Sequence, residues 1–351
     1  MILRNGKRIV NGDMPYIVAE LNSSHNGKVS IAREMIDAAK DCGCDAVKFQ
    51  SWSAESLYCQ DYYDKNPISR RMVHGFSLKP GELLELAEYC DEIGIDFSST
   101  PYSEGEVDFL VEKCRAPFVK IASMDINNLP YLRYIAQKKI AVVLSTGMAT
   151  VEEIEAAVAE MEDAGNRNIC LLHCVSLYPT DVQAVNLNNM AMLKERFPDY
   201  AVGYSDHTIG SEAACASVGL GAALIEKHFT LSHEKIGWDN QMATEPTDMK
   251  ELVDVCRRAY KCLGTYERSL TSDEIEQQKK MRRSIVAAID MSKGHRIEGR
   301  DLTAKRPGDG ISVSEYKSVI GQVLNRDVQR DQLILEEYFA DCTMSEKNGE
   351  E

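Results

Sequence analysis

Short apolar runs alternate with longer helical patterns along residues 1–264 of this chain. Runs rich in β-branched residues and bounded by turn residues are typical of buried strands, and apolar residues three and four positions apart are typical of helices. This alternation indicates an α/β protein. Eight strands are predicted, at residues 16–21, 45–50, 95–100, 118–122, 140–146, 168–174, 201–206 and 223–230.

A helical pattern follows each predicted strand. The clearest are residues 29–43, 150–165 and 247–264, of which the last two open with Thr as a predicted N-cap and close with Gly. Eight strand–helix units in about 250 residues are typical of a (β/α)₈ TIM barrel. A doubly wound open sheet is the alternative, but it usually has fewer strands and a glycine-rich first turn, and residues 20–28 are not such a turn.

The pattern changes after Gly264, which predicts that a barrel domain of residues 1–264 ends there. Residues 265–281 are charged and lack a clear apolar face, which indicates a linker or an exposed helix. Residues 282–340 contain short extended runs at 284–291 and 332–339 and repeated turn signals, typical of a small, mainly-β domain. The polar residues 341–351 are predicted to be a disordered tail.

Composition narrows the classes of protein to which the chain can belong. A hydrophobic content of 44% in 351 residues is enough for one large domain and a small one. The net charge of −15 argues against a nucleic-acid binder or a partner of anionic membranes, because both need basic surface. Any anionic substrate must therefore meet a local group of Lys and Arg.

The cysteines and the apolar runs indicate the cellular compartment of the protein. The eleven cysteines are scattered at spacings that fit neither a zinc ribbon nor a redox motif, so we expect reduced thiols. The first thirteen residues lack the apolar core of a signal sequence, and the longest apolar run, residues 216–225, stops after ten residues. We therefore expect a cytoplasmic protein.

Polar residues end every predicted strand. In a TIM barrel the active site lies at the C-terminal ends of the strands, so these residues are expected to meet. Isolated turns and helix caps do not explain polar side chains at eight consecutive strand ends. In chain order they are Glu20; Lys48 and Gln50; Ser99 and Thr100; Lys120, then Ser123 and Asp125; Ser145 and Thr146; His173, then Ser176 and Tyr178; Ser205, Asp206 and His207; and Glu226, Lys227 and His228.

Two lysines among these residues indicate an anion site. Lys48 shares a strand face with Gln50, because side chains two apart point the same way, and Glu226 and His228 share a face for the same reason. A buried ammonium is costly without a partner, so Lys48 and Lys120 inside a barrel mouth suggest a bound anion. The alternative is that each lysine pairs with a neighbouring carboxylate.

His207 and His228 end two adjacent predicted strands. Neighbouring strands lie about 5 Å apart, so the two imidazoles can converge on one ion. Two histidines with oxygen ligands suit a divalent Lewis acid, with Mn²⁺ or Mg²⁺ favoured over Zn²⁺. A histidine alone is more often a hydrogen-bonded core residue, and His25 and His173 remain open as pocket residues.

Seven segments resemble the signature segments of the sialic acid synthase family, in the same order. They are IVAELNSSHNGKVSIAREMIDAAKDCGCDAVKFQ, STPY, VKIAS, LSTGM, LLHCVSLYPT, GYSDHTIG and IEKHFT, and AKRPGDGIS near the C-terminus resembles a loop of the family's antifreeze-protein-like (SAF) domain. The resemblance covers residues 12 to 340. It implies a TIM barrel followed by a SAF domain.

The resemblance also implies an activity, the condensation of phosphoenolpyruvate with an open-chain N-acyl hexosamine to a nine-carbon 2-keto sugar acid and phosphate. It implies a domain-swapped homodimer in which Arg306 reaches the N-acyl group from the partner subunit. His207 and His228 match the family's ligands for Mn²⁺ or Mg²⁺. The other implied residues are, for phosphoenolpyruvate, Lys48, Gln50, Thr100, Lys120, Ser123, Ser145 and Ser205, and, for sugar hydroxyls, protons and water, Glu20, Asp125, Tyr178 and Asp239, with Ser176 as a further substrate-binding candidate.

Several residues depart from the family pattern, and they gather on the expected sugar side: Ser24, Met124, Asp125, Val175, Trp238 and Asn240. The acceptor therefore stays open between N-acetylmannosamine and a diacetamido-6-deoxy hexose, as in legionaminic or pseudaminic acid synthases. One alternative function is a synthase or metal aldolase acting on another sugar or a sugar phosphate, for which Arg306, Arg70 and Arg71 are the candidate basic residues. Another is a catalytically inactive carbohydrate-binding protein.

Overall fold

The computed structural model describes residues 1–235 and 237–339. The chain divides into two compact units, the first of which is Met1–Gly264 and the second of which begins at Thr265. The predicted disordered tail, residues 341–351, lies outside the described residues. Among the described helices, none has both the length and the hydropathy that crossing a membrane requires.

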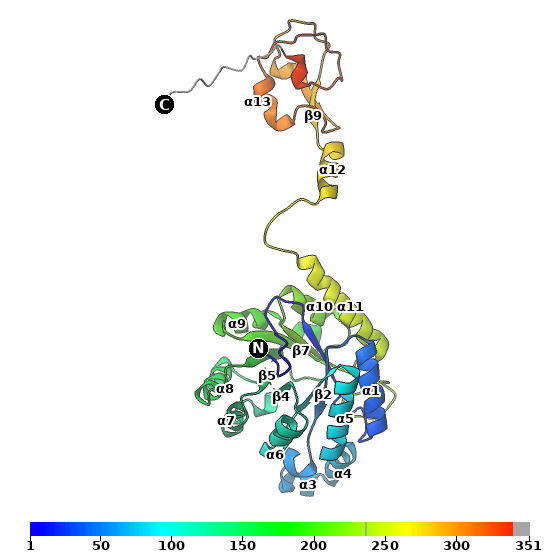
Figure 1. Ribbon diagram of the computed structural model, residues 1–351, viewed down its shortest axis with the longest axis vertical. Coiled ribbons are helices and arrows are strands. Elements are labelled where there is room, and N and C mark those ends of the chain that lie inside the picture. Colours follow the sequence, from blue (N-terminus) through cyan, green and yellow to red (C-terminus); the bar gives the residue numbers. More distant parts are fainter. Residues whose placement is uncertain (236, 340–351) are drawn as a thin grey trace. The chain divides into compact units, whose positions relative to one another are not determined.

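The first unit is a parallel barrel surrounded by helices (Figure 1). Its sheet has eight strands in the order β3-β2-β1-β8-β7-β6-β5-β4, so strands that follow one another along the chain lie side by side. The predicted TIM barrel is confirmed. The strands are β1 (Tyr16–Glu20), β2 (Ala46–Gln50), β3 (Asp96–Thr100), β4 (Phe118–Ile121), β5 (Ala141–Ser145), β6 (Ile169–Cys174), β7 (Ala201–Asp206) and β8 (Leu224–His228).

The barrel closes where its first and last strands meet. β1 pairs in parallel with β8, and Glu20 lies opposite His228 in that register. β3 and β4 are the ends of the strand order. Between them the Ser98 hydroxyl donates a hydrogen bond to the Phe118 carbonyl oxygen at 2.9 Å, so a buried side chain joins the two strands where the ladder is interrupted.

Helices cover the outer face of this sheet (Figure 1). Their apolar faces pack on the outward side chains of the strands to form the main core, of which Ile17, Phe49 and Val142 are fully buried members. The helices of the first unit are α1 (Val29–Asp41), α2 (Ala54–Leu57), α3 (Gln60–Lys65), α4 (Pro67–Phe76), α5 (Pro80–Ile93), α6 (Glu104–Asp108), α7 (Leu129–Gln137), α8 (Val151–Asp163), α9 (Asn188–Arg196), α10 (Glu212–Gly219) and α11 (Pro246–Leu263).

The predicted helix caps are partly right. Thr150 caps α8, because its hydroxyl accepts from the Glu153 N–H while the Glu153 carboxylate accepts from the Thr150 N–H. Thr247 is not the N-cap of α11, which is Glu245. The helix begins one residue earlier at Pro246, where a fixed φ suits the first turn and the missing N–H costs no hydrogen bond.

The inward-facing side chains form an apolar half of the barrel interior near the strand starts and a polar half near the strand ends. Near the strand starts most inward side chains are apolar, including Tyr16, Val18 and Phe118. Leu3 and Ile9 of the N-terminal segment pack against them. Two or four residues further along the same inward rows stand the polar residues Glu20, Lys48, Gln50, Thr100, Lys120, Ser145, Ser205, Glu226 and His228. The polar side chains that could bind a ligand or act in catalysis therefore lie at the C-terminal end of the barrel.

The second unit begins with an exposed helix. α12 (Ser272–Met281) has no buried residue. β9 (Ser284–Ala287) and β10 (Leu302–Lys305) then form an antiparallel pair, and the short α13 (Tyr316–Val319) comes after them. The expected extended run at residues 332–339 is wrong in its second half, because Glu336–Tyr338 form a 3₁₀ turn. This turn accompanies the burial of both Ile334 and Tyr338, four residues apart, in the core of this unit.

Candidate active site

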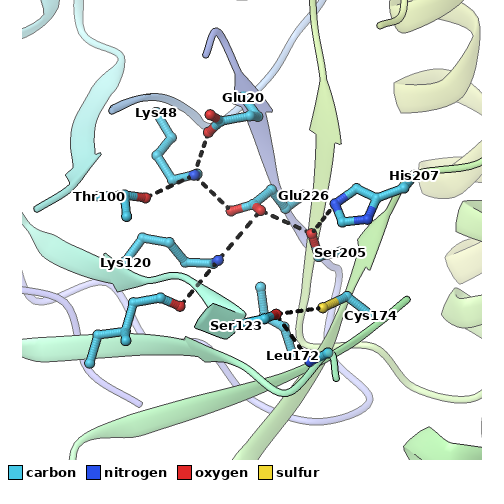
Figure 2. A network of polar contacts seen from close by, with 12 residues as sticks. Glu20, Lys48, Thr100, Lys120, Ser123, Leu172, Cys174, Ser205, His207 and Glu226 are labelled. Carbon is cyan, nitrogen blue, oxygen red and sulfur yellow. Dashed lines mark hydrogen bonds and ion pairs between the residues drawn. The ribbon is translucent and has the colours of Figure 1, made fainter. Parts of the chain in front are cut away.

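Four charged side chains meet at the C-terminal end of the barrel (Figure 2). The Lys48 ammonium contacts the Glu20 carboxylate and lies 3.7 Å from Glu226 Oε2. The Lys120 ammonium lies 3.7 Å from Glu226 Oε1. All four side chains are buried. Glu226 on β8 therefore lies between two lysines that come from β2 and β4, the strands on either side of β3.

The observed ion pairs weaken the prediction of a bound anion from lysine burial alone. Burial of Lys48 and Lys120 suggested a bound anion, but each ammonium has a protein carboxylate within salt-bridge distance. The lysines are therefore not unpaired charges, and their burial alone does not demand a ligand. The site holds two formal positive and two formal negative charges, so an anionic ligand must compete with or rearrange these pairs.

Burial and charge act in opposite directions on the four groups. Burial raises the pKa of the Glu20 carboxyl and lowers the pKa of the Lys120 ammonium. Burial also opposes ionisation of Glu226, but the Lys120 and Lys48 ammonium groups outweigh it and lower the pKa of Glu226 to about 2. Glu226 is therefore an ionised carboxylate shared by two lysines.

Neutral hydrogen-bonding groups extend this cluster along β2 and β3. The Lys48 ammonium donates to the Thr100 hydroxyl at 3.1 Å. The Gln50 amide donates to Glu20 Oε1 at 2.8 Å and accepts from the Tyr102 hydroxyl at 3.1 Å. The predicted residues Glu20, Lys48, Gln50 and Thr100 thus form one connected network.

The two histidines lie beside the charged cluster. Ser205 connects His207 to it, because its hydroxyl donates to Glu226 Oε1 at 3.0 Å and lies 3.3 Å from His207 Nε2. The rings of His207 and His228 have centroids 5.2 Å apart and planes inclined at 72°. The Tyr178 ring lies 4.3 Å from the His207 ring and 5.6 Å from the His228 ring.

One nitrogen of each histidine faces an oxygen of the protein. His207 Nδ1 donates to the Val175 carbonyl oxygen at 2.7 Å, because a carbonyl can only accept. His228 Nδ1 contacts the Asp239 carboxylate. Metal-binding histidines commonly hold their second nitrogen in this way, which fixes the ring and leaves Nε2 for the ion.

These histidines fit an incomplete metal site. Within residues 1–235 and 237–339, no three His, Cys, Asp or Glu side chains form a group able to hold a metal ion by themselves. Two imidazole nitrogens suit a divalent ion whose remaining ligands are oxygens of substrate or water. The orientation of His207 and His228 by Val175 and Asp239 is compatible with such an ion.

A second group of small polar atoms surrounds Gly147, which comes just after β5. Its N–H donates to the Ser123 hydroxyl at 3.0 Å, and that hydroxyl lies 3.2 Å from the Cys174 sulfur. A Cβ at position 147 would stand 2.9 Å from Ser123 Oγ, 2.8 Å from Cys174 Sγ and closer still to Ser176 Oγ. Only a glycine fits among these side chains without displacing one of them, and we call Gly147 and these three side chains the Ser/Cys recess.

The remaining predicted site residues differ in placement. Ser145 is buried at the end of β5, two residues before Gly147. Asp125 is partly buried beyond β4, and burial raises the pKa of its carboxyl. Arg306 is exposed in the second unit, so its part in the site stays a prediction. His173 points outward from the barrel, where its Nε2 hydrogen-bonds to the Val185 carbonyl oxygen at 2.7 Å.

Two of the residues that depart from the family pattern touch each other. The Ser24 hydroxyl donates to Asn240 Oδ1 at 2.5 Å, so these departures form one local change. Trp238, two residues before Asn240, packs its ring against Trp52 with centroids 5.4 Å apart and against Phe76 at 6.0 Å. An aromatic wall thus stands next to Asp239, the residue that contacts His228.

Sequence reasoning did not assign roles to Glu226, Cys174 and Tyr102. Glu226 is the hub of the charged cluster, and the signal for it was present in its spacing of two residues from His228 on β8. Cys174 was treated as a core thiol, although it ends the inward row of β6 beside Ser123. Tyr102 is distant from Gln50 in the sequence, and the two residues meet only in the folded chain.

Comparisons with known proteins identify the family of this chain. The NeuB family model matches residues 35–268, and the SAF domain model matches residues 282–339. An N,N'-diacetyllegionaminic acid synthase of Legionella pneumophila is 36% identical over 352 residues, covering 95% of this chain and 98% of that protein. A human N-acetylneuraminate-9-phosphate synthase is 32% identical over 344 residues, covering 94% of each. The crystal structure of a sialic acid synthetase from Leptospira borgpetersenii, in complex with citrate, aligns with a TM-score of 0.70 and 32% identity over 76% of this chain and 90% of that one.

Proposed function

Because this chain belongs to the NeuB family and carries a SAF domain, we propose that it joins phosphoenolpyruvate to an open-chain N-acyl hexosamine. The products are a nine-carbon 2-keto sugar acid and inorganic phosphate. The chain is a carbon–carbon bond-forming synthase of the sialic acid type, like its relatives that make legionaminic and pseudaminic acids. The observation that carries the proposal is the link through Ser205 between the Lys48–Glu226–Lys120 cluster and His207, whose ring lies beside that of His228.

The lysine side of the site would bind phosphoenolpyruvate. Lys48 and Lys120 would hold its carboxylate and phosphate by charge, with no covalent bond to either amine. The hydroxyls of Thr100, Ser123, Ser145 and Ser205, the Gln50 amide and the Gly147 N–H would supply neutral hydrogen bonds. The recess around Gly147, which also includes Ser176, gathers hydroxyl groups that suit a phosphate oxygen.

The histidine side would receive the acceptor aldehyde. His207 and His228 would hold Mn²⁺ or Mg²⁺, which would supply Lewis-acid stabilisation of the charge that develops on the aldehyde oxygen when C3 of phosphoenolpyruvate attacks. Val175 and Asp239 keep the two imidazoles oriented for that ion. Which metal serves in the cell stays a prediction.

The chain's carboxyl and phenol groups would then manage protons. After the new bond forms, water adds to the cationic C2 and the C–O bond to phosphate breaks. Glu20 lies beside the Lys48 amine, and burial raises the pKa of its carboxyl, which suits a group that takes and returns a proton. Asp125, Tyr178 and Asp239 are our candidates for contacts with the sugar hydroxyls.

The acceptor and the assembly are finer parts of the proposal. We infer an acceptor with an N-acyl group, either N-acetylmannosamine or a diacetamido-6-deoxy hexose. Arg306 would bind that acyl group from the partner subunit's second domain in a domain-swapped homodimer. A cytoplasmic location also stays a prediction.

Phosphate release tests the activity. The protein would be incubated with phosphoenolpyruvate, Mn²⁺ and a panel of N-acetylmannosamine, its 6-phosphate and a diacetamido-6-deoxy hexose. We expect phosphate release that depends on one of the two unphosphorylated acceptors and that chelation abolishes. Release only with the phosphorylated sugar would favour the sugar-phosphate alternative, and no acceptor-dependent phosphate from any of them would refute the synthase.

A further inference from the structure

Behind the histidine pair, on the outward face of the sheet, two charged residues are buried together. Asp206 ends β7 and Lys227 is the fourth residue of β8, and the register places them directly opposite each other. The exposed fractions are 0% for Asp206 and 1% for Lys227. Their strand neighbours Ser205 and Glu226 face the barrel interior, so this pair faces away from the reacting groups.

All the hydrogen-bonding capacity of the Lys227 ammonium is used. It donates to Asp206 Oδ2 at 2.8 Å, to the Thr208 carbonyl oxygen at 2.6 Å and to the Gly210 carbonyl oxygen at 3.0 Å. An ammonium has three donors, and each has one acceptor here. The segment just after β7 is therefore folded around this charge.

Asp206 holds the other end of the same segment. Its Oδ1 accepts from the Thr208 N–H at 2.9 Å, from the Thr208 hydroxyl at 2.8 Å and from the Tyr204 hydroxyl at 3.1 Å. His207 lies between Asp206 and Thr208 in the chain. Its backbone is thus fixed on both sides by a single buried network.

The network also connects the two strands that carry the histidines. Lys227 immediately precedes His228, and Asp206 immediately precedes His207. A change in the distance between Asp206 and Lys227 must move the two imidazoles relative to each other, because each is one peptide unit away from the pair. Neither Asp206 nor Lys227 touches an imidazole in the contacts described.

We propose that the Asp206–Lys227 ion pair is a positioning pair that sets the separation of His207 and His228 and thereby the affinity of the site for a divalent cation. The inference rests on the proposed function of the two histidines. It gives Asp206 a role distinct from orienting an imidazole directly. A pair that served only stability would leave cation affinity unchanged in any variant that still folds.

The test measures Mn²⁺ affinity of the full-length protein by calorimetry, together with its melting temperature. Asp206→Asn keeps the shape of the side chain and removes its charge. The double variant Asp206→Leu/Lys227→Met replaces the whole pair with apolar groups of similar size, a change that buried ion pairs often tolerate without loss of stability. In both variants we expect the Kd for Mn²⁺ to rise at least about tenfold, the scale seen when groups that orient metal ligands are altered.

Two controls separate the possible causes. Asn166→Ala removes a buried polar side chain whose hydrogen bonds lie before β6, at the other end of the barrel, and should lower the melting temperature without weakening Mn²⁺ binding. His207→Ala should abolish Mn²⁺ binding. A folded Asp206→Asn or double variant with wild-type affinity, beside a His207→Ala variant that binds no Mn²⁺, would overturn the inference and leave the proposed function standing. If the wild-type protein binds no Mn²⁺, the metal site and the inference fall together.

Discussion

The Lys120 ammonium nitrogen lies 3.7 Å from Glu226 Oε1 at the mouth of the barrel. Folding buries the Lys120 side chain, and this burial lowers the pKa of its ammonium. The Glu226 carboxylate favours the positive charge of Lys120, and it also favours that of Lys48. Removing that one negative charge should therefore disturb both lysines at once.

Glu226→Gln should destabilise the protein by about 3 kcal/mol, because a buried ion pair that loses one partner leaves an uncompensated charge. The amide keeps the shape of the side chain and can still accept from Ser205. We also expect kcat/KM for phosphoenolpyruvate to fall at least about tenfold. Chemical denaturation and phosphate-release kinetics measure the two effects. The exposed residue Glu195, changed to Gln, is the matched control; equal behaviour of the two variants would show that Glu226 is not the hub.

Gly147→Ala should damage activity more than stability. The new Cβ would meet Ser123 Oγ, Cys174 Sγ and Ser176 Oγ, all ends of side chains that can rotate away. The protein can therefore fold, but the hydroxyls and the thiol of the recess would be displaced. We expect the KM for phosphoenolpyruvate to rise at least about tenfold, with a change in melting temperature of a few degrees at most.

A matched glycine makes this prediction specific. Gly105 lies in α6, where an added Cβ would have no neighbour within 4 Å. Gly105→Ala should leave the KM unchanged and slightly stabilise the helix. If Gly147→Ala also binds phosphoenolpyruvate normally, the recess is not part of the donor site.

The barrel could be predicted from the sequence because the periodicities of its strands and helices are local patterns. The eight strands were recognisable as short apolar runs, and alternation alone placed Lys48 with Gln50 and Glu226 with His228 on shared faces. The pairing of lysines with carboxylates was harder to predict, because it depends on β2, β4 and β8 meeting across the barrel. The contact between Ser24 and Asn240 likewise joins residues 216 positions apart, which no local pattern encodes.

Caps and short turns were less predictable for a different reason. Thr247 has the chemistry of an N-cap, but Pro246 begins α11 and moves the cap to Glu245. Residues 332–339 begin with an apolar run typical of a strand, but Tyr338 joins the small core four residues after Ile334. In both places a single neighbouring residue or a tertiary contact outweighs the propensity of the segment.

His25 should make stability depend on pH. Burial lowers the pKa of its imidazole to about 4, while the unfolded chain has the ordinary value of about 6.5. Between these values the unfolded state binds a proton that the folded state does not. The contribution of His25 is therefore fully present above about pH 6.5 and is lost as the pH falls towards 4. Since each pKa unit is worth about 1.4 kcal/mol, the loss approaches about 3 kcal/mol.

Denaturation curves from pH 7.5 to 4 measure this slope. His25→Asn keeps an acceptor for the Gly27 N–H, which His25 Nδ1 accepts at 3.1 Å, but has no proton to gain. Its free energy of unfolding should fall less steeply with acid than that of the wild-type protein. The exposed His74, changed to Asn, should keep the wild-type slope. Parallel curves for the wild-type and His25→Asn proteins would exclude the buried neutral imidazole.

Trp238 should affect the acceptor and not the donor. Its ring packs on Trp52 and Phe76, and its chain neighbour Asp239 contacts His228. It therefore lies on the histidine side of the site, away from the recess at Gly147. Trp238→Ala removes one face of the aromatic wall and should raise the KM for the N-acyl hexosamine by about tenfold, the loss expected for an apolar substituent that no longer packs on a ring. The KM for phosphoenolpyruvate, measured in the same assay, should stay within about twofold of the wild-type value. A rise in both constants would mean that the wall supports the barrel mouth as a whole, and no rise in either would place the acceptor elsewhere.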